Sequence, residues 1–551
     1  MVDFLRRAPF DLDQSGIDWV ERTLAAMGPQ ERAGQLFIHF SMGADPGELS
    51  RLSALAPAGI TRFFGGTLDA EADFLDAAQA GANVPLLIAS DLEGSRMSLP
   101  FGTEVPNPLA LAAVDDLQAS RDIAGIMARE AVAIGVNWTL TPVIDINAAF
   151  RSPIVATRGF GSDVARIEAQ ALTQIAAFQS EGVAATVKHW PGEGHDDRDQ
   201  HLVTTVNPLD MDAWEANHGR LYRAAIAAGV KAVMSAHIAF PAYIRSLNPD
   251  AGVEAFRPAS VSRDLNQGLL RDKLGFNGVI LSDATPMAGF GAWGPRSIML
   301  PEVIKNGCDL ILFSDDPEAD HALILAAISD GRISQTRLET ALRRVLGLKA
   351  SLGLHLGVRK AARDRIGLSG DRTAARAVTA RAPTLVKDLT GLIPLSPARH
   401  KRVLVVSGGV VIPFLPEPLP LDLPELLRAE GFVVTLHEKG QHIRPEDWDL
   451  VIYALAEETL LTRGRIFLDW LKLTGSFDAA MQRVWHEVPT LLISFGYPYL
   501  LYDAPRAPCY INAYASMPTM QAAVVDCIVG RAPFQGTSPV DPFCGLEDAH
   551  Y

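Results

Sequence analysis

The chain has 551 residues, more than one hydrophobic core ordinarily accommodates, so two or three domains are expected. Hydrophobic residues make up 48% and charged residues 21% of the chain, which excludes a disordered or low-complexity protein. The net charge of -15 disfavours nucleic acid and anionic membranes as partners, because both select basic surfaces. The acidic balance is compatible with a small neutral ligand.

The cysteines and the N-terminal segment also restrict the class of protein. The four cysteines are scattered and form no CxxC pair, which argues against a disulfide framework and a zinc ribbon. Arg6 and Arg7 are not followed by an apolar run, and we find no signal peptide and no apolar stretch of membrane-spanning length. We therefore expect a cytoplasmic protein without a membrane partner, and the oligomeric state stays open.

Short apolar runs alternate with helical patterns over the first part of the chain. Each run is rich in branched apolar residues, as a strand buried on both faces requires, and intervening stretches such as 164–182 are amphipathic. Eight such runs predict an N-terminal TIM-type (β/α)8 barrel, although an open doubly wound sheet gives a similar alternation. The runs are 34–40, 59–66, 85–91, 135–145, 184–190, 231–238, 278–283 and 308–313.

A smaller second domain is predicted after the barrel. We assign residues 1–356 to the barrel, including a helix over 333–354, residues 357–394 to a polar, Arg-rich linker, and residues 395–551 to a C-terminal α/β sandwich. No Walker-type phosphate loop and no internal repeat is present, and we expect no cofactor. Five strand-like runs support the sandwich: 402–407, 432–437, 449–455, 490–495 and 509–514.

Polar side chains stand at the ends of several barrel runs. The third run ends in Asp91, the fifth in Lys188 and His189, the sixth near His237, and the seventh in Asp283. A single strand-end Asp or His is as often a loop cap, but barrel enzymes build their active sites from the C-terminal ends of the strands. Their shared position indicates a catalytic face.

The loop 188–201 concentrates histidines and carboxylates, and three interpretations are open. These residue types are suitable metal ligands, but the spacing H-x5-H-x5-H is not a known helical ligand pattern, so we predict no metal. Alternatively, Asp199 lies two residues before His201 and can orient its ring, leaving one ring nitrogen to exchange a proton near neutral pH. The third interpretation is a solvated, charged surface loop.

Asp283 ends the seventh run, and Pro286 stops the strand shortly after it. A carboxylate fixed at a strand end in a barrel mouth is suited to nucleophilic attack at an anomeric carbon. Asp is also a good helix N-cap, and both roles suit a residue in such a position.

Several segments, in order along the chain, resemble glycoside hydrolase family 3, and most closely its β-N-acetylglucosaminidase branch. ASDLEGSR is similar to the family's D-x-E-G-G-R strand end, and VKHWPGEGHDDRDQH is similar to K-H-F-P-G-H-G-D-T-x-x-D-S-H. GVILSDATPM is similar to G-V-V-x-S-D-D-L-x-M, and TPVIDIN with TRGFGSD is similar to A-P-V-x-D-x-N with R-S-F-G-x-D. So many motifs in one order are specific for the family, and less so for the substrate.

The resemblance implies a retaining exo-β-glycosidase with a covalent glycosyl–enzyme intermediate, most closely a β-N-acetylhexosaminidase acting on a small carbohydrate substrate. Asp283 falls on the family nucleophile, His201 on the acid/base histidine and Asp199 on its dyad partner. Such a dyad is unusual, because most glycosidases use a second carboxylic acid. Four residues fall on positions that bind sugar hydroxyls in the family: Asp91, Arg158, Lys188 and His189.

The chain departs from the family pattern close to these positions. In PGEGH, Glu193 replaces a histidine and His195 an aspartate, and in SDA, Ala284 removes a carboxylate beside the nucleophile. Ser95 replaces a glycine, and Trp190 replaces a phenylalanine, where we expect it to add a large ring to the pocket floor or wall. The departures leave the proposed nucleophile and dyad in place and put the N-acetyl preference in question.

Three alternatives stay open. A neutral-sugar enzyme such as a β-glucosidase would typically take an acid/base glutamate from the second domain, where Glu457, Glu458 and Glu487 are candidates. Phosphate could replace water as the acceptor, because a histidine repels an anion less than a glutamate does. A non-catalytic sugar-binding protein on the same fold is the alternative outside the enzyme class.

Overall fold

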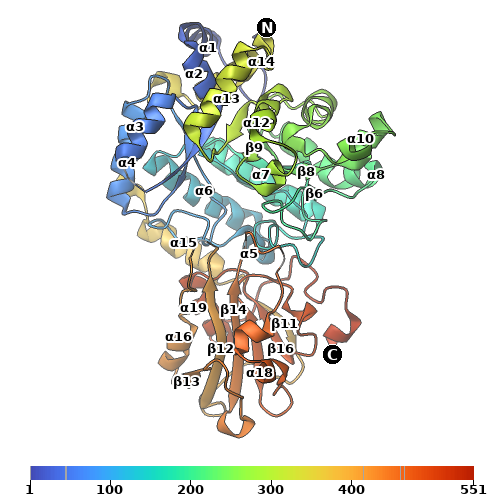
Figure 1. The fold of residues 1–551 in the computed structure, drawn as a ribbon. Helices are drawn as coiled ribbons and strands as arrows, with labels where there is room; N and C mark the ends of the chain where they lie inside the picture. The colour runs from blue at the N-terminus through green and yellow to red at the C-terminus, as the bar shows by residue number, and fades with distance from the viewer. Residues whose placement is uncertain (1, 44–45, 414, 460, 465) are drawn as a thin grey trace.

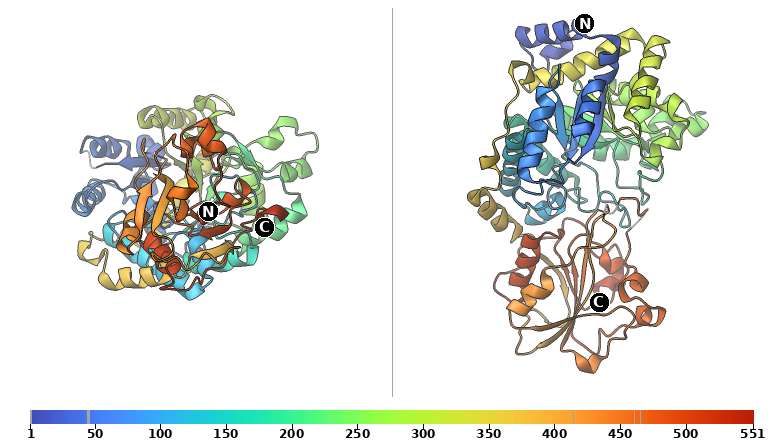
Figure 2. Two further views of the ribbon diagram at one scale, coloured as in Figure 1. Left: turned by 90° about the horizontal axis from the view of Figure 1, so that it is seen from below. Right: turned by 60° about the vertical axis from the view of Figure 1, so that its left-hand side comes forward.

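The computed structural model describes residues 2–43, 46–413, 415–459, 461–464 and 466–551 (Figure 1). The chain forms two domains that lie end to end, with the barrel at one end and the second domain at the other (Figures 1 and 2). Of the helices in the described ranges, none combines the length and the apolar character needed to cross a bilayer.

Within the described ranges, eight parallel strands form the sheet of the first domain, in the order β4-β3-β2-β1-β10-β9-β7-β5. Backbone bonds between the β4 and β5 regions close this sheet, since Thr139 N–H donates to Ala184 O at 2.8 Å and Ile144 N–H donates to Lys188 O at 3.0 Å. The predicted barrel is confirmed, and the open sheet is excluded. The strands are β1 (Phe37–Met42), β2 (Gly59–Phe63), β3 (Leu87–Ser90), β4 (Trp138–Thr139), β5 (Thr186–Trp190), β7 (Ala232–Ser235), β9 (Val279–Ala284) and β10 (Leu310–Leu312).

Helices surround the barrel and bury the outer faces of its strands, which explains why the predicted runs are apolar throughout. Acidic N-caps start several of them: the Asp116 carboxylate accepts from the N–H groups of Gln118 and Ala119 in the first turn of α6, and the Asp163 carboxylate accepts from Arg166 N–H at the start of α7. The helices are α1 (Gln14–Ala26), α2 (Pro29–Gly34), α3 (Pro46–Leu55), α4 (Leu68–Ala80), α5 (Pro108–Val114), α6 (Leu117–Ile134), α7 (Val164–Ser180), α8 (Met211–Trp214), α9 (Arg220–Ala227), α10 (Pro241–Leu247), α11 (Ala288–Gly291), α12 (Arg296–Lys305), α13 (Pro317–Ser329) and α14 (Gln335–Ser351). Strands β6 (Thr205–Val206) and β8 (Ile238–Ala239) form a small separate sheet.

The second domain is built on a mixed sheet in the order β11-β16-β15-β14-β12-β13. Only β11 runs antiparallel among the described strands of this sheet, and helices cover both faces, which confirms the predicted α/β sandwich (Figure 2). The strands are β11 (Thr384–Asp388), β12 (Arg402–Val411), β13 (Val433–Leu436), β14 (Leu450–Glu457), β15 (Thr490–Ser494) and β16 (Cys509–Asn512). The helices are α15 (Ser369–Thr379), α16 (Leu423–Ala429), α17 (Trp470–Thr474), α18 (Phe477–Met481) and α19 (Pro518–Ile528).

The predicted linker, 357–394, contains α15 and β11, and β11 is the edge strand of the second sheet. The domain boundaries themselves stay a prediction. The ends of β12 and β14 point toward the mouth of the barrel (Figure 1), and the residues that follow them line a cavity there. The second domain therefore supplies one wall of the cavity at the C-terminal ends of the barrel strands.

A buried ion pair fixes the ends of β1 and β2 at this face. Arg62 Nε donates to Glu71 Oε2 at 2.8 Å, and Arg62 Nη1 donates to Ser41 Oγ at 3.0 Å. The other Glu71 oxygen accepts from Gly66 N–H at 2.9 Å, and both charged side chains are 0% exposed. The pair joins two neighbouring strand ends to the loop before α4.

Replacing Glu71 by alanine would leave the Arg62 charge buried without its partner. We expect this change to cost about 3–5 kcal/mol of unfolding free energy, measured by chemical denaturation. The control is Glu446→Ala, which removes the partner of a largely exposed arginine, Arg444, and should leave the unfolding midpoint unchanged. Equal losses in the two variants would contradict a structural role for the buried pair.

Candidate functional site

A cavity of about 410 Å³ opens at the C-terminal ends of the barrel strands, between the two domains. The barrel supplies most of its charged side chains, and the second domain supplies Val411, Ile412, Pro413, Glu458, Thr459, Leu461 and Ser516. The structure brings six of the seven sequence-predicted site residues to this cavity: Asp91, Arg158, Lys188, His189, His201 and Asp283. The seventh, Asp199, lies directly behind His201.

A chain of alternating charges forms one side of the cavity. Lys188 Nζ lies 2.8 Å from Asp91 Oδ1 and 2.8 Å from Glu93 Oε1. Arg158 contacts the same Glu93 with Nε at 2.8 Å and Nη2 at 2.9 Å, in a bidentate pair. These contacts fix the two cations in place beside the cavity.

The ionisation of this chain follows from its contacts. Burial opposes the charged form of Glu93, but Arg158 and Lys188 outweigh it and hold the pKa of that carboxyl well below its usual range. Burial likewise opposes the Lys188 charge, but Asp91 and Glu93 raise the pKa of the amine above its ordinary value. Glu93 was not predicted as a site residue, although it stands two positions after Asp91 in the same strand-end motif.

His189 is oriented by a carboxylate that sequence reasoning also missed. Its Nδ1 lies 2.6 Å from Asp145 Oδ2, and Asp145 Oδ1 accepts from the backbone N–H groups of His189 at 3.0 Å and Glu193 at 2.8 Å. Because Nδ1 is occupied, Nε2 is the ring nitrogen that a ligand in the cavity can use. Asp145 ends the fourth apolar run, so its position at a strand end was a signal already present in the sequence.

Asp199 and His201 form the predicted pair. Asp199 Oδ1 lies 2.7 Å from His201 Nδ1 and also accepts from His201 N–H at 2.8 Å. Its second oxygen, Oδ2, accepts from Thr462 N–H of the second domain at 2.7 Å. Asp199 is buried, so the interpretation of this loop as a solvated surface is wrong for the pair.

Asp283 stands at the end of β9. Its Oδ1 accepts from Ala284 N–H at 2.8 Å, whereas Oδ2 is buried without a hydrogen-bond partner among the described residues. Helix α11 begins later, after Met287, so Asp283 is not its N-cap. His237, named only as a strand-end residue from the sequence, lies with Nε2 2.9 Å from Ala284 O and so fixes the strand end.

The charges around Asp283 favour its ionised form. Burial raises the pKa of this carboxyl, but the imidazoles of His189, His237 and His201, together with Ala284 N–H, more than offset the burial and bring the pKa below its ordinary value. An ionised carboxylate with one unpartnered oxygen is suited to act as a nucleophile.

Two of the departures from the family pattern lie beneath the site. Glu193 is buried, and its Oε2 accepts from Gln200 Nε2 at 3.0 Å. Burial, and then the nearby carboxylates of Asp145 and Asp283, raise the pKa of Glu193 well above its usual value, which favours its protonated form. His195 stands beside His218, with ring centroids 5.3 Å apart.

The expectation that Trp190 belongs to the pocket floor or wall is wrong. Its ring is fully buried outside the cavity, 4.7 Å from the Tyr222 ring and 5.8 Å from the Trp214 ring. The register of β5 shifts between Val187 and Trp190, so consecutive side chains do not simply alternate there. Lys188 and His189 both face the cavity, and Trp190 turns toward the surrounding helices.

One group of potential metal ligands occurs among the described residues: the donor atoms of Asp145, His189 and Glu193 lie within 4.8 Å of one another. These atoms are already engaged, because His189 Nδ1 contacts Asp145 Oδ2 and Gln200 donates to Glu193 Oε2. An ion at this point would displace those hydrogen bonds. That the chain uses no metal stays a prediction.

The three glutamates considered in the second domain take different positions. Glu458 lines the catalytic cavity, while Glu457, the preceding residue, lines a separate cavity of about 280 Å³ within the second domain. This divergence follows from the alternation of side chains along β14. Glu487 is exposed and lines neither cavity.

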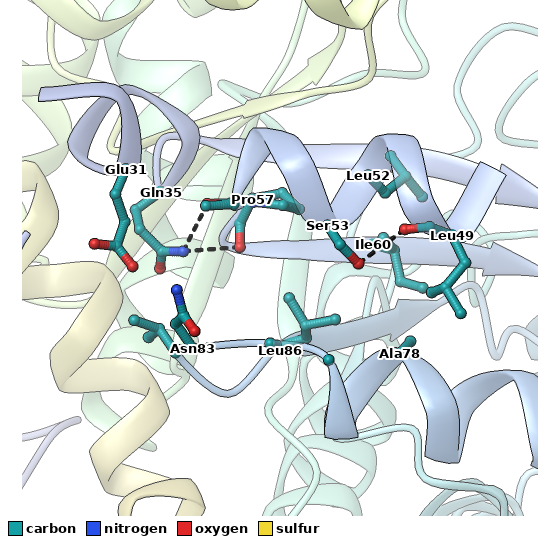
Figure 3. Close-up of a pocket in the computed structure, with 14 residues that line it drawn as sticks. Glu31, Gln35, Leu49, Leu52, Ser53, Pro57, Ile60, Ala78, Asn83 and Leu86 are labelled. Carbon is teal, nitrogen blue, oxygen red and sulfur yellow. Dashed lines mark hydrogen bonds between the residues drawn. The ribbon is translucent and has the colours of Figure 1, made fainter. Parts of the chain in front are cut away.

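A further cavity, of about 50 Å³, is lined by residues of α3 and α4 and of the segments that enter β2 and β3 (Figure 3). It lies near the N-terminal ends of these strands, and Gln35 Nε2 donates there to Ala56 O at 2.9 Å and Pro57 O at 2.8 Å. Because barrel enzymes build active sites at the other face, this cavity is not a candidate for the chemistry.

The raised pKa of Glu193 predicts a pH dependence of stability. Above about pH 4.5, the ordinary pKa of a glutamate, this group ionises more readily in the unfolded chain than in the folded chain. The contribution of Glu193 to the free energy of folding is therefore lost as pH rises from that value toward the folded pKa. Glutamine does not ionise, so Glu193→Gln should gain stability relative to the native chain between pH 5 and 8, by at most ~1.4 kcal/mol per pH unit. Chemical denaturation at pH 5 and at pH 8 measures this difference, and a pH-independent difference would contradict a raised pKa of Glu193.

Comparison with known proteins agrees with this geometry. The model of the glycosyl hydrolase family 3 N terminal domain matches residues 59–348. A β-N-acetylglucosaminidase/β-glucosidase of Cellulomonas fimi is 40% identical over 567 aligned positions, which cover 100% of both chains. The solved structure of the β-glucoside phosphorylase BglX is 34% identical with a TM-score of 0.92 and covers 100% of both chains. A family 3 β-N-acetylglucosaminidase from Paenibacillus sp. str. FPU-7 is 26% identical with a TM-score of 0.81, over 95% of this chain and 100% of that one.

Proposed function

This chain belongs to glycosyl hydrolase family 3, and from the geometry of its cavity we propose that it removes one β-linked sugar from the non-reducing end of its substrate with retention of configuration. It is a glycoside hydrolase, so the non-catalytic sugar-binding alternative is set aside. The observation that carries the proposal is the ionised Asp283 with its unpartnered Oδ2 in a cavity that also holds a dyad-bound histidine, His201.

In the first step, Asp283 Oδ2 attacks the anomeric carbon while the bond from that carbon to the departing oxygen breaks. His201 gives its Nε2 proton to the departing oxygen, because its Nδ1 is held by Asp199. The product of this step is a glycosyl ester on Asp283 and a free alcohol.

In the second step, His201 takes a proton from water, and the water oxygen attacks the anomeric carbon and releases Asp283. Two inversions at one carbon give net retention. Asp199 stabilises the imidazolium that forms in this step, since both of its oxygens are fixed by hydrogen bonds.

The polar side of the cavity is proposed to bind the sugar. Asp91, Lys188, Arg158 and His189 offer both donors and acceptors, as vicinal hydroxyl groups require. Full-length similarity to a relative named for both β-N-acetylglucosaminides and β-glucosides supports these two sugar classes. A β-N-acetylhexosaminidase is our main proposal, with a neutral-sugar β-glycosidase as the alternative.

Phosphate is a second candidate for the acceptor. A histidine acid/base repels an anionic acceptor less than a glutamate acid/base does, and the chain resembles the β-glucoside phosphorylase BglX over its whole length. The product separates the two acceptors, because phosphate gives a glycosyl phosphate and water gives the free sugar. A panel of nitrophenyl glycosides with and without phosphate identifies both the sugar and the acceptor.

Removing the imidazole of His201 tests the acid/base assignment. His201→Ala should lower kcat/KM about 10²–10⁴-fold for alkyl glycosides, whose poor leaving groups need a proton, and much less for dinitrophenyl glycosides. Steady-state kinetics on both substrates measures the contrast. Unchanged activity on the alkyl glycoside would show that another residue is the acid.

A 2-fluoro glycosyl fluoride should label Asp283 covalently. The fluorine at C2 slows both formation and hydrolysis of the glycosyl–enzyme intermediate, whereas the good fluoride leaving group keeps its formation fast enough for the intermediate to accumulate. Mass spectrometry of peptides should find the glycosyl mass on the peptide that contains Asp283, and on no peptide of Asp283→Asn. A label on a different carboxylate would reassign the nucleophile.

A further inference from the structure

We propose that Glu458, carried by the second domain, is a positioning residue for the acid/base dyad. It anchors the segment that follows β14 to the barrel, and this segment presents Thr462 N–H to Asp199. The inference rests on the proposed function, because the dyad of Asp199 and His201 is what the segment positions. The second domain thereby contributes to catalysis by positioning the dyad, and none of its residues is the acid.

The Glu458 carboxylate joins the two domains directly. Its Oε1 accepts from Ser95 Oγ at 2.8 Å, and its Oε2 accepts from Asn107 Nδ2 at 3.0 Å, both on the barrel. On the second domain, Ser516 donates to Oε1 with N–H at 2.9 Å and with Oγ at 2.6 Å. One carboxylate thereby connects the loop after β3, the start of α5 and the segment after β16.

The same junction is braced by neighbouring contacts. Arg96 Nε donates to Ser516 Oγ, and Arg96 Nη2 to Ser516 O, each at 3.1 Å. Asn107 Nδ2 also donates to Tyr514 O at 2.8 Å. The position of Glu458 relative to the barrel is therefore fixed by several bonds, and Thr462 lies only four residues further along the chain.

Thr462 N–H completes the hydrogen bonding of the dyad carboxylate. Asp199 Oδ1 is used by His201, and Oδ2 is used by Thr462 at 2.7 Å. Asp199 is buried, so without Thr462 this oxygen would lose the donor that compensates for its removal from water. The carboxylate could then rotate, and the His201 ring would lose its fixed orientation.

Backbone strain gathers at this junction. Ser95, Thr462 and Tyr514 have φ of 48°, 65° and 66°, in the left-handed region that residues other than glycine rarely adopt. Strain of this kind persists where the surrounding contacts determine it, and it concentrates at functional sites. Ser95 replaces a glycine of the family motif, so the chain accepts strain there and gains a hydroxyl that binds Glu458.

The same contacts argue against Glu458 as the acid itself. Four donors converge on its two oxygens, so both oxygens already accept hydrogen bonds from the protein and neither is left to face a departing sugar oxygen. A positioning role and an acid role therefore predict different kinetics, although both would make Glu458 important for activity.

The test compares Glu458→Ala and Glu458→Gln with the neighbouring Glu457→Gln, whose side chain lines the separate cavity. We expect Glu458→Ala to lose about 10- to 100-fold in kcat/KM on an alkyl glycoside but less than about threefold on a dinitrophenyl glycoside, because only the proton transfer is misaligned. The pH profile of kcat/KM should also move. Glu458→Gln keeps one acceptor oxygen and should be intermediate, and Glu457→Gln should match the native enzyme.

A milder variant keeps the test valid if Glu458→Ala folds poorly. Ser95→Gly restores the glycine of the family motif, relieves the strained backbone and removes one bond to Glu458. It should lower activity on the alkyl glycoside in the same direction, by a smaller factor, while thermal unfolding shows no loss of stability. Unchanged activity in this variant together with an unchanged pH profile in Glu458→Gln would overturn the proposal.

The other outcomes are distinguishable. Equal losses on both substrates with an unmoved pH profile would reduce Glu458 to a structural contact between domains. Restoration of Glu458→Ala by azide, with a β-glycosyl azide as product, would make Glu458 the acid/base. In that case the dyad assignment of the proposed function fails as well, and His201→Ala should retain activity on the alkyl glycoside.

Discussion

Closure of the barrel between β4 and β5 is the constraint on which the site depends. Parallel pairing around a closed ring places the C-terminal ends of all its strands on one face. Asp91, Asp145 and His189 are far apart in the sequence, but they follow or end neighbouring strands in the ring. Without closure, the regions of β4 and β5 would be opposite edges of an open sheet, and His189 would lose the carboxylate that orients it.

Burial of charge is the second constraint, and the site satisfies it by pairing. Lys188 and Arg158 share the carboxylates of Asp91 and Glu93, so none of these charges faces the low-dielectric interior alone. Glu193 has no arginine or lysine in contact among the described residues, and burial raises its pKa instead. The pKa values of Asp283 and of Glu193 beneath it are therefore shifted in opposite directions, because their neighbours differ.

The second domain contributes to the site through a few hydrogen bonds rather than through a broad catalytic surface. Its segment after β14 reaches the barrel at Ser95 and Asn107 and ends on Asp199. In the mechanism that we propose, the acid is His201 of the barrel, and the second domain orients it through Asp199. The phosphate and water alternatives share this geometry, because both use the same histidine.

The sequence by itself determined the fold class, the strand positions and most of the residues proposed for the site, although Glu93 and Asp145 were missed. Period and run length depend on local burial, and strand-end positions follow from the topology of a barrel, so Asp283 could be named in advance. His201 and Asp199 were named from their two-residue spacing and from the resemblance to the family. What only the tertiary structure decided depends on contacts between distant segments. Trp190 faces outward because the register of β5 shifts, and Glu458 contacts Ser95 because the two domains pack together. Neither contact depends on a pattern of neighbouring residues, so neither can be predicted from the local sequence.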